Sequence, residues 1–443
     1  MTGSADAAQT DFTQAAAEVT AIAQDLIRFD TQNWGDGKAN PDLPAAEYIK
    51  GKFDEVGLES TIYTSGEGRA NLLARIPGRN PERGALVVHG HTDVVPADAS
   101  EWSVDPFGGI IKDGLLWGRG AVDMKDMDAM IIASVRHLVR QGIQPDRDLV
   151  IAFFADEEAG SAFGAKFMVD NHADLFTGAT DAVSEVGGYS VDIRGQRAYL
   201  VQTAEKGLLW LKLTARGSAG HGSQVNRDNP ITKLAQAVAR IGEHEWPQEI
   251  PIATQQLLRG VSDMTGIEFA AENYGALLDE LGSVQKFVGA TFNNISNPTL
   301  LSGGYKHNVI PGEASALIDC RPLPGRTEDM MLTIKELAGP DVEVDTLIEG
   351  VALETPFTGR TVDAMVSSLQ AEDPGATVLP YALSGGTDNK QLSRLGITGY
   401  GFAPLQLTPD LDFPAMFHGV DERVPVAALE FGTKVLGRFM LDS

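Results

Sequence analysis

Residues 85–96 read ALVVHGHTDVVP, so a short apolar run leads directly into a cluster of polar side chains. From Met127 to Val139, apolar residues recur at helical spacing, and this helix is expected to end near Gly142. Further apolar runs that predict strands occupy residues 71–76, 149–154 and 181–186. Strands that alternate with helices predict an α/β fold, with a mixed, mostly parallel sheet and helices on both faces.

The pattern changes after about Thr203 and predicts a second unit. Asn229 and Pro230 are typical of a helix N-cap and first helical residue. Other predicted elements are strands at 208–214, 309–317 and 342–347 and a helix at 328–337, while 243–301 is rich in loops and stays unassigned. Because the α/β pattern resumes after about Glu354, we expect one catalytic domain formed by residues 1–204 and 351–443, interrupted by an inserted α+β domain, residues 205–350.

The composition excludes several classes of protein. Against 61 acidic residues there are 35 Lys and Arg, which gives a formal net charge of −26 over 443 residues. Nucleic-acid binding needs a basic face, and anionic membranes are disfavoured for the same reason. No long apolar run predicts a membrane span, and residues 1–14 lack the features of a signal peptide, so a cytoplasmic protein is expected. The single cysteine, Cys320, excludes an internal disulfide and is expected to be buried at a strand end.

Two histidines follow the first quoted strand. In an extended segment His89, His91 and Asp93 point to one face. A histidine with a carboxylate nearby is typical of metal sites, where the acid holds the second ring nitrogen. Taken alone, the pattern fits a buried core histidine better than a metal ligand. The choice between these two interpretations therefore depends on other segments of the chain.

Acidic residues end several other segments. Asp123 lies in a glycine-rich turn, where it could cap the next helix or bridge two cations. Glu157 and Glu158 directly follow a strand, and ligands bind at the carboxyl ends of parallel strands. Adjacent acids repel one another unless they are solvated or bound to a cation. Glu185 closes another strand, and His418 lies in a late loop.

Together these segments resemble the M20 family of metallopeptidases and amidohydrolases, which includes aminoacylases, carboxypeptidase S and succinyl-diaminopimelate desuccinylase. The resemblance follows the family order along the whole chain and rests on the motifs HGHTDVVP, WSVDPF, GRGAVDMKD, ADEEAG, SEVGG, GSAGHGS, NVIPGEA, DCRPLPG, SGGTDNK and FHGVDER. It implies a zinc-exopeptidase-like fold with an inserted lid or dimerisation domain, in agreement with the division above.

The resemblance implies two metal ions. It assigns His91 and Glu185 to one ion, Glu158 and His418 to the other, and Asp123 to both. Two imidazoles and three carboxylates, without a thiolate, suit Zn²⁺, for which Co²⁺ or Mn²⁺ could substitute.

Further roles come from the same resemblance. A hydroxide held between the metals would attack an amide, and Glu157, free of metal, would act as the general base. Asp93 would orient His91, while His89 is expected to have a structural role. The family often has a cis peptide after its bridging aspartate, which here is the bond between Asp123 and Met124.

Residues outside the metal centre are implied to act on the substrate. His221 resembles a histidine that stabilises the oxyanion in a neighbouring active site, which implies a homodimer through the inserted domain. Arg321 and Asn308 resemble residues that hold a substrate carboxylate. Gly386 and Thr387 resemble a loop that contacts the substrate.

We therefore predict a dizinc hydrolase of N-acyl amino acids or short peptides with a free carboxylate. Lys390 stands where many relatives have Arg, which favours the aminoacylase and carboxypeptidase S branch. A metal-dependent carboxypeptidase or dipeptidase is the nearest alternative. An M28-type aminopeptidase would not need the inserted-domain motifs, and a non-catalytic binding protein would be expected to lack a ligand or the base.

Overall fold

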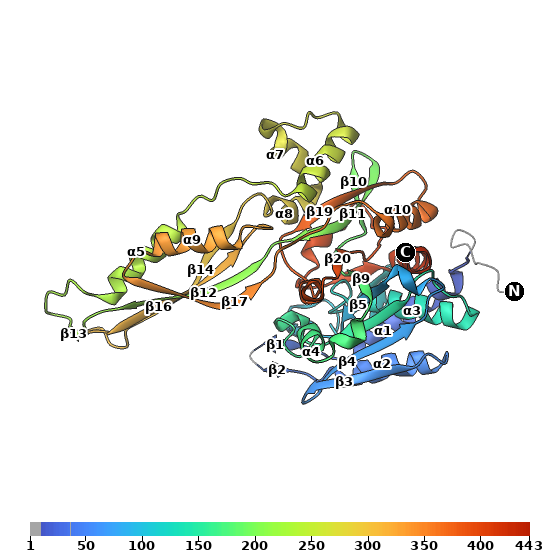
Figure 1. Cartoon of the computed structure of the whole chain (residues 1–443), viewed down its shortest axis with the longest axis horizontal. Coiled ribbons are helices and arrows are strands. Elements are labelled where there is room, and N and C mark those ends of the chain that lie inside the picture. Colours follow the sequence, from blue (N-terminus) through green and yellow to red (C-terminus); the bar gives the residue numbers. More distant parts are fainter. Residues whose placement is uncertain (1–9, 36) are drawn as a thin grey trace.

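The computed structural model describes residues 10–35 and 37–443, so the expectation about a signal peptide falls largely outside the described residues. The chain forms a large α/β body from which a slender second unit extends (Figure 1). The far end of this extension carries β13 (Gly220–His221).

Ten of the described strands form the large sheet, with the order β10-β11-β20-β9-β5-β8-β4-β3 and with β18 and β19 paired to β11. The central pairs β20–β9, β9–β5 and β5–β8 are parallel, whereas β8–β4, β4–β3 and β10–β11 are antiparallel. The strands are β3 (Ser60–Gly66), β4 (Arg69–Ile76), β5 (Ala85–His91), β8 (Leu149–Phe154), β9 (Ala179–Ser184), β10 (Tyr189–Ile193), β11 (Gln196–Glu205), β18 (Leu353–Glu354), β19 (Thr377–Leu383) and β20 (Thr398–Gly401). Strands from residues 60–205 and from residues 353–401 thus build one mixed sheet, in which the parallel pairs are central but do not outnumber the antiparallel ones, so the expectation of a mostly parallel sheet is wrong in this respect.

Helices cover both faces of this sheet, which confirms the predicted α/β class. Leu86 and Val88 of β5 join one core, whereas Val87 between them joins the other, because side chains alternate along a strand. The first core contains α1 (Thr13–Arg28), α2 (Leu43–Asp54), α3 (Lys125–Gln141), α10 (Arg360–Glu372) and α12 (Val426–Asp442), and the second contains α4 (Ala165–Asn171) and α11 (Asn389–Leu392). Helix α3 ends before Gly142, which has a left-handed backbone with φ of 62°.

The extension is an antiparallel sheet with the order β14-β16-β12-β17. Helices α5 and α9 cover one of its faces, where Leu209, Leu211 and Leu213 are buried. Asn229 caps α5 as predicted, since its side-chain oxygen accepts a hydrogen bond from the Ile231 amide at 3.0 Å. The elements are β12 (Leu208–Arg216), α5 (Pro230–Gly242), β14 (Ile295–Gly303), β15 (Val309–Ile310), β16 (Glu313–Arg321), α9 (Thr327–Ala338) and β17 (Val342–Gly350).

The segment that the sequence left unassigned contains α6 (Ile252–Thr265), α7 (Tyr274–Asp279) and α8 (Gln285–Gly289). Although it lies within the predicted insertion, Leu257 and Val288 of this segment belong to the core of the large sheet. The division at residues 205 and 350 stays a prediction, but the buried residues that form the separate core of the extension come from its own sheet, α5 and α9.

Short elements complete the large body. They are the hairpin β1 (Asn33–Gly35) and β2 (Lys38–Ala39), and the small sheet β6 (Ile110–Lys112), β7 (Leu115–Trp117) and β21 (Arg423–Pro425). Among the helices of the described residues, none has the length and apolar character needed to cross a membrane.

Candidate metal centre

The predicted ligands meet at one edge of the large sheet. His91 is the last residue of β5, and Glu185 follows the neighbouring strand β9. Glu157 and Glu158 lie in a short turn after β8, on the other side of β5. Because these three strands are parallel, their carboxyl ends and the residues that follow them converge.

Asp123 connects two groups of side chains. Its Oδ1 lies 3.2 Å from His91 Nε2, which is also 3.6 Å from Glu185 Oε2. Its Oδ2 lies 3.3 Å from His418 Nε2, which is also 3.2 Å from Glu158 Oε2. The structure therefore brings together all five residues that the resemblance assigned to metal, grouped around the two oxygens of Asp123. The peptide bond between Asp123 and Met124 is cis, as the resemblance implied.

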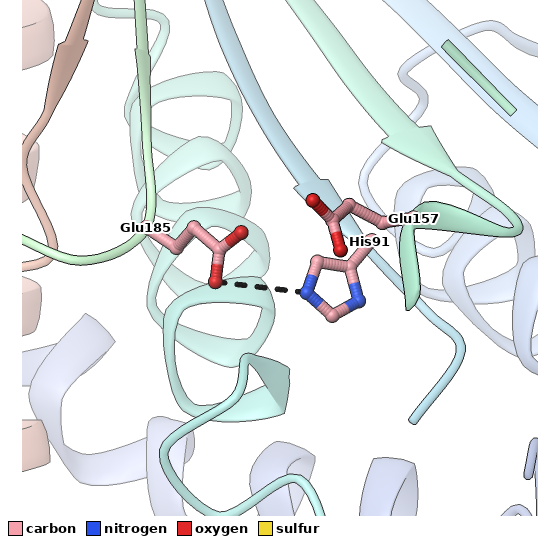
Figure 2. Close-up of side chains that lie close together, drawn as sticks. All are labelled: His91, Glu157 and Glu185. Atoms are coloured by element: carbon pink, nitrogen blue, oxygen red, sulfur yellow. Dashed lines mark ion pairs between the residues drawn. The ribbon is translucent and has the colours of Figure 1, made fainter. Parts of the chain in front are cut away.

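Glu157 faces the first of these groups. Its carboxylate points towards His91 and Glu185 (Figure 2), and potential ligand atoms of the three residues lie within 4.8 Å of one another. A carboxylate at this distance can reach a small molecule held by the other two residues.

The protonation of the cluster reflects an excess of carboxylates. Burial lowers the pKa of His91, but the charges of Glu185 and Asp123 outweigh burial and raise it well above its usual value. Hydrogen bonds to Asp123 and Glu158 raise the pKa of His418 to about 10. Burial, together with the charge of Asp123, raises the pKa of Glu185 well above its usual value. Without metal, protons on these side chains therefore offset part of the negative charge of the cluster. Metal binding would displace these protons.

The donor set fits divalent cations such as zinc. It offers imidazole nitrogen and carboxylate oxygen from His91, Asp123, Glu158, Glu185 and His418. Glu158 Oε1 is buried and has no hydrogen-bond partner among the described residues, as expected for an atom that a cation would satisfy.

The residues behind His91 orient its ring. His91 Nδ1 donates to the backbone carbonyl of Asp93 at 2.9 Å, which leaves Nε2 directed at Asp123 and Glu185. The Asp93 carboxylate accepts instead from the amides of Glu157 and Glu158, at 3.0 and 3.3 Å. Asp93 is therefore linked to both the histidine and the acidic turn.

His89 has the structural position that was expected. It is buried against Phe154, and its Nε2 donates to Asn389 Oδ1 at 3.0 Å. Burial lowers the pKa of His89 to about 4, so its ring stays neutral.

Glu422 is a residue of the site that sequence reasoning missed. Its buried carboxylate accepts hydrogen bonds from the amides of Gly120, Val122 and Asp123, at 3.0, 2.7 and 3.1 Å, and pairs with Arg119 at 2.8 Å. The signal was present in the motif FHGVDER, but the sequence does not show that this glutamate is buried behind the turn of Asp123.

The predicted substrate residues do not lie together. His221 and Asn308 are at the far end of the extension, where the Asn308 carbonyl accepts from the Gly222 amide at 2.9 Å. Arg321 lies at the opposite end of β16, close to the large body, and pairs with Asp319 through Nε at 2.8 Å. Within one chain, Asn308 and Arg321 are thus separated by the length of β16.

Gly386 and Thr387 lie beside the connection between the two sheets. Thr387 is buried and donates through Oγ1 to Glu205 Oε1 at 2.6 Å. A side chain at Gly386 would collide with the ammonium of Lys390, because an added Cβ would lie 2.0 Å from Nζ. Lys390 Nζ donates to the carbonyl of Lys206, between β11 and β12, at 2.7 Å. This loop therefore contacts the connection between the two sheets.

Comparison with known proteins gives a consistent result. The sequence pattern of peptidase family M20/M25/M40 matches residues 87–442. The chain is 27% identical over 401 residues to N-fatty-acyl-amino acid synthase/hydrolase PM20D1 of Xenopus tropicalis, covering 87% of this chain and 77% of the relative. It is 26% identical over 413 residues to aminoacylase-1 of Sus scrofa, covering 89% of each. The crystal structure of Sso-CP2, an M20 family metallo-carboxypeptidase from Sulfolobus solfataricus, aligns with a TM-score of 0.73 at 17% identity, covering 96% of this chain and 99% of that one.

The fold, the histidine and carboxylate cluster and the relatives define the class of protein: this is a metal-dependent hydrolase of the peptidase and aminoacylase type. The chain belongs to peptidase family M20/M25/M40, which confirms the resemblance found in its sequence motifs.

Proposed function

We propose that the protein is an amidohydrolase that binds two zinc ions, for which cobalt or manganese can substitute. Its substrate is an N-acyl amino acid or a short peptide with a free carboxylate. The observation that carries this proposal is the pair of ligand groups that share Asp123, with Glu157 beside one of them. The names of the relatives, an N-fatty-acyl-amino acid synthase/hydrolase and an aminoacylase, support the substrate class.

The ligand groups suggest how two ions would be held. His91, Asp123 and Glu185 would hold one ion, and Asp123, Glu158 and His418 would hold the other. When bound, such ions would lower the pKa of a water molecule and offset the charge of the carboxylates.

Glu157 is the proposed general base. Its carboxylate is near His91 and Glu185 but belongs to the turn that Asp93 holds through the backbone. It would accept the proton of the attacking water and return it to the nitrogen of the leaving amine. The water oxygen would bond to the amide carbon, the C–N bond would break, and the acid and the amine would leave without any covalent bond to the enzyme.

Arg321 is the proposed partner of the substrate carboxylate. A guanidinium offers two parallel donors, and Arg321 already uses Nε and Nη2 to hold Asp319 at 2.8 and 3.1 Å. A substrate would compete with Asp319 for these donors. Burial lowers the pKa of Lys390, and among the nearby charges that of Arg321 lowers it further whereas that of Glu157 raises it, which supports a position of Arg321 near the metal centre.

His221 is the proposed donor to the oxyanion of a neighbouring site. Its Nδ1 accepts from the Ser223 amide at 3.2 Å, which leaves Nε2 as the ring nitrogen that can donate outward. Because His221 lies at the end of the extension farthest from the large sheet (Figure 1), we propose that it serves a second copy of the chain.

The homodimer would form through the inserted unit. Strand β14 is at the edge of its sheet, and Leu300 and Leu301 on it are 53% and 64% exposed. An exposed apolar edge strand is suited to pairing with a symmetry-related copy.

A metal analysis, a panel of substrates and a variant of Glu157 test the proposed function. Metal analysis of freshly purified protein should give two divalent ions per chain, and a panel of N-acyl amino acids and dipeptides should contain a substrate. Glu157→Ala should keep both ions but lower kcat by about 10⁴-fold, because only the proton transfer is removed. Glu82→Ala, on an exposed turn, is the matched control and should change neither.

Protein without bound divalent ions would contradict the metal proposal, and near-normal turnover of Glu157→Ala would contradict its role as base. Preference for dipeptides over N-acyl amino acids in the panel would favour the carboxypeptidase or dipeptidase alternative. The cytoplasmic location expected from the sequence stays a prediction, which cell fractionation would test.

A further inference from the structure

The hairpin that contains Asn33 packs behind the acidic turn of the metal centre. Asn33 is 4% exposed, and its side-chain amide donates to Asp93 Oδ2 and to Asp156 Oδ1, both at 2.9 Å. Its own oxygen accepts from the Gly35 amide at 3.1 Å. Both N–H groups and the oxygen of this side chain are thus used, which is typical of a buried amide with a defined orientation.

The two aspartates that Asn33 joins are the ones that hold the acidic turn. Asp93 accepts from the backbone amides of Glu157 and Glu158. Asp156 begins the turn and accepts from the Phe163 amide at 3.0 Å through Oδ2. Asp156 also has a left-handed backbone with φ of 66°, which side chains other than glycine rarely adopt without support.

The negative charges on both sides of Asn33 favour a neutral amide at this position. The carboxylates of Asp93 and Asp156 would repel each other, and a neutral group with two donors lets both oxygens approach the same side chain. Arg69 adds the nearest positive charge, with Nη2 at 3.0 Å from the Asp156 oxygen that Asn33 also contacts and Nη1 at 2.8 Å from Asp42.

The backbone fixes Asn33 relative to the loop of Asp93. The Asn33 amide donates to the Val94 carbonyl at 2.9 Å, and the Val94 amide donates to the Thr31 carbonyl at 3.2 Å. Thr31 Oγ1 also donates to the Thr92 carbonyl at 2.6 Å. The segment from Thr31 to Asn33 is therefore attached on both sides of Asp93.

We propose that Asn33 is a positioning residue of the active site. Through Asp93 and Asp156 it sets the direction of Glu157, the proposed base, and of Glu158, a proposed ligand. Asn33 itself does not reach the reacting atoms. This inference rests on the proposed function, since it assigns Asn33 to the same site.

The test compares variants that differ in donors at this position. Asn33→Ser keeps one donor, Asn33→Ala keeps none, and Asn33→Asp replaces the donors by a third carboxylate. Zinc affinity is measured by competition with a chromophoric chelator. It is expected to decrease in the order wild type, Ser, Ala and Asp. For Asn33→Ala we expect zinc affinity to fall about 10-fold or more and kcat at saturating metal to fall about 100-fold, with KM within about 3-fold.

The neighbouring residue Gln32 provides a matched control. It is also buried and makes two side-chain contacts, with Asp30 at 2.9 Å and with the Ala97 amide at 2.8 Å, but it does not contact the acidic turn. Gln32→Ala should lower thermal stability to a similar extent as Asn33→Ala and leave both zinc affinity and kcat within about 3-fold of wild type.

Several outcomes would overturn the proposal. One is an Asn33→Ala protein that loses thermal stability while its zinc affinity, its kcat or both stay at the wild-type value. If Asn33→Ala does not fold, the Ser variant decides in the same way. Wild-type protein that neither binds zinc nor turns over any substrate would instead refute the proposed function. Zinc binding and turnover of the wild type are therefore measured before the variants are compared.

Discussion

The metal centre and the far end of the extension differ in how the chain assembles them. His91 ends β5, and Glu158 and Glu185 follow the neighbouring parallel strands β8 and β9, so the topology of one sheet places them together. His221 and Asn308 lie instead on the pair β13–β15, at the end of a separate sheet (Figure 1). The first group lies together within one chain, whereas residues of the second group could reach a metal centre only if the extension moved or, as proposed above, if they served a second copy.

The sharing of Asp123 predicts the largest effect. Asp123→Ala should lower bound zinc from two ions to fewer than one per chain, because this carboxylate has one oxygen in each ligand group. Activity should fall by about 10⁴-fold or more, since the water is no longer activated. Metal analysis after gel filtration measures the bound zinc, and steady-state kinetics measure the activity. Asp54→Ala, on the exposed side of α2, is the control, and full zinc occupancy in the Asp123 variant would disprove the shared arrangement.

Mixing two inactive variants tests whether the end of the extension acts on a second copy. His221→Ala should lower kcat by about 10²- to 10³-fold through loss of the oxyanion donor. After unfolding and refolding with Glu157→Ala, half of the dimers are mixed, and one of the two sites in each has both residues. Activity should therefore return to about a quarter of the wild-type value.

Action within one chain predicts no recovery in this mixture, because no chain carries both functional residues. His244→Ala is the matched control. This residue packs against Trp246 within the inserted segment, and its variant mixed with Glu157→Ala should give about half of the wild-type activity.

The sequence predicted the elements whose pattern is local. The apolar run at 149–154 coincides with β8, the helix over Met127–Val139 ends before Gly142, and Asn229 caps α5. These features depend on side-chain periodicity and on backbone preferences of single residues. The proposed ligands came from the resemblance of the motifs, and the fold brings those residues together because strand ends in a parallel sheet share one edge.

Features that depend on distant contacts were not predicted. Helices α7 and α8 have six and five residues, too short to show a helical period, and each contributes one buried residue, Leu277 or Val288, to the core of the large sheet. Asn33 and Glu422 resemble ordinary polar residues in the sequence, and only the fold buries them behind the acidic turn and the Asp123 turn. The separation of Asn308 from Arg321 likewise follows from the length of β16, which their motifs do not describe.

Arg321 allows a smaller test at the other end of the same strand. Arg321→Ala should raise KM for a carboxylate substrate by about 10- to 100-fold and change kcat little, because one charge-assisted contact is lost. For the same substrate with an amide in place of the carboxylate, KM should change by less than about 3-fold. Arg326→Ala, which loses an exposed pair with Glu249, is the control. Equal losses on both substrates would show that Arg321 only supports the sheet.

The smallest expected effect concerns the separation of the two cores. Cys320 is buried in the core of the extension, where burial raises the pKa of its thiol to about 12. At pH 8 the thiol is therefore protonated in the folded protein, and a thiol reagent reacts only when this core opens.

Because the metal centre adjoins the other core, removing metal with a chelator should lower the melting temperature but change the labelling rate of Cys320 by less than about 3-fold. Labelling in denaturant gives the full count of one thiol. If chelation accelerates labelling about 10-fold or more, the extension loses its structure together with the metal centre, and the two regions are not independent.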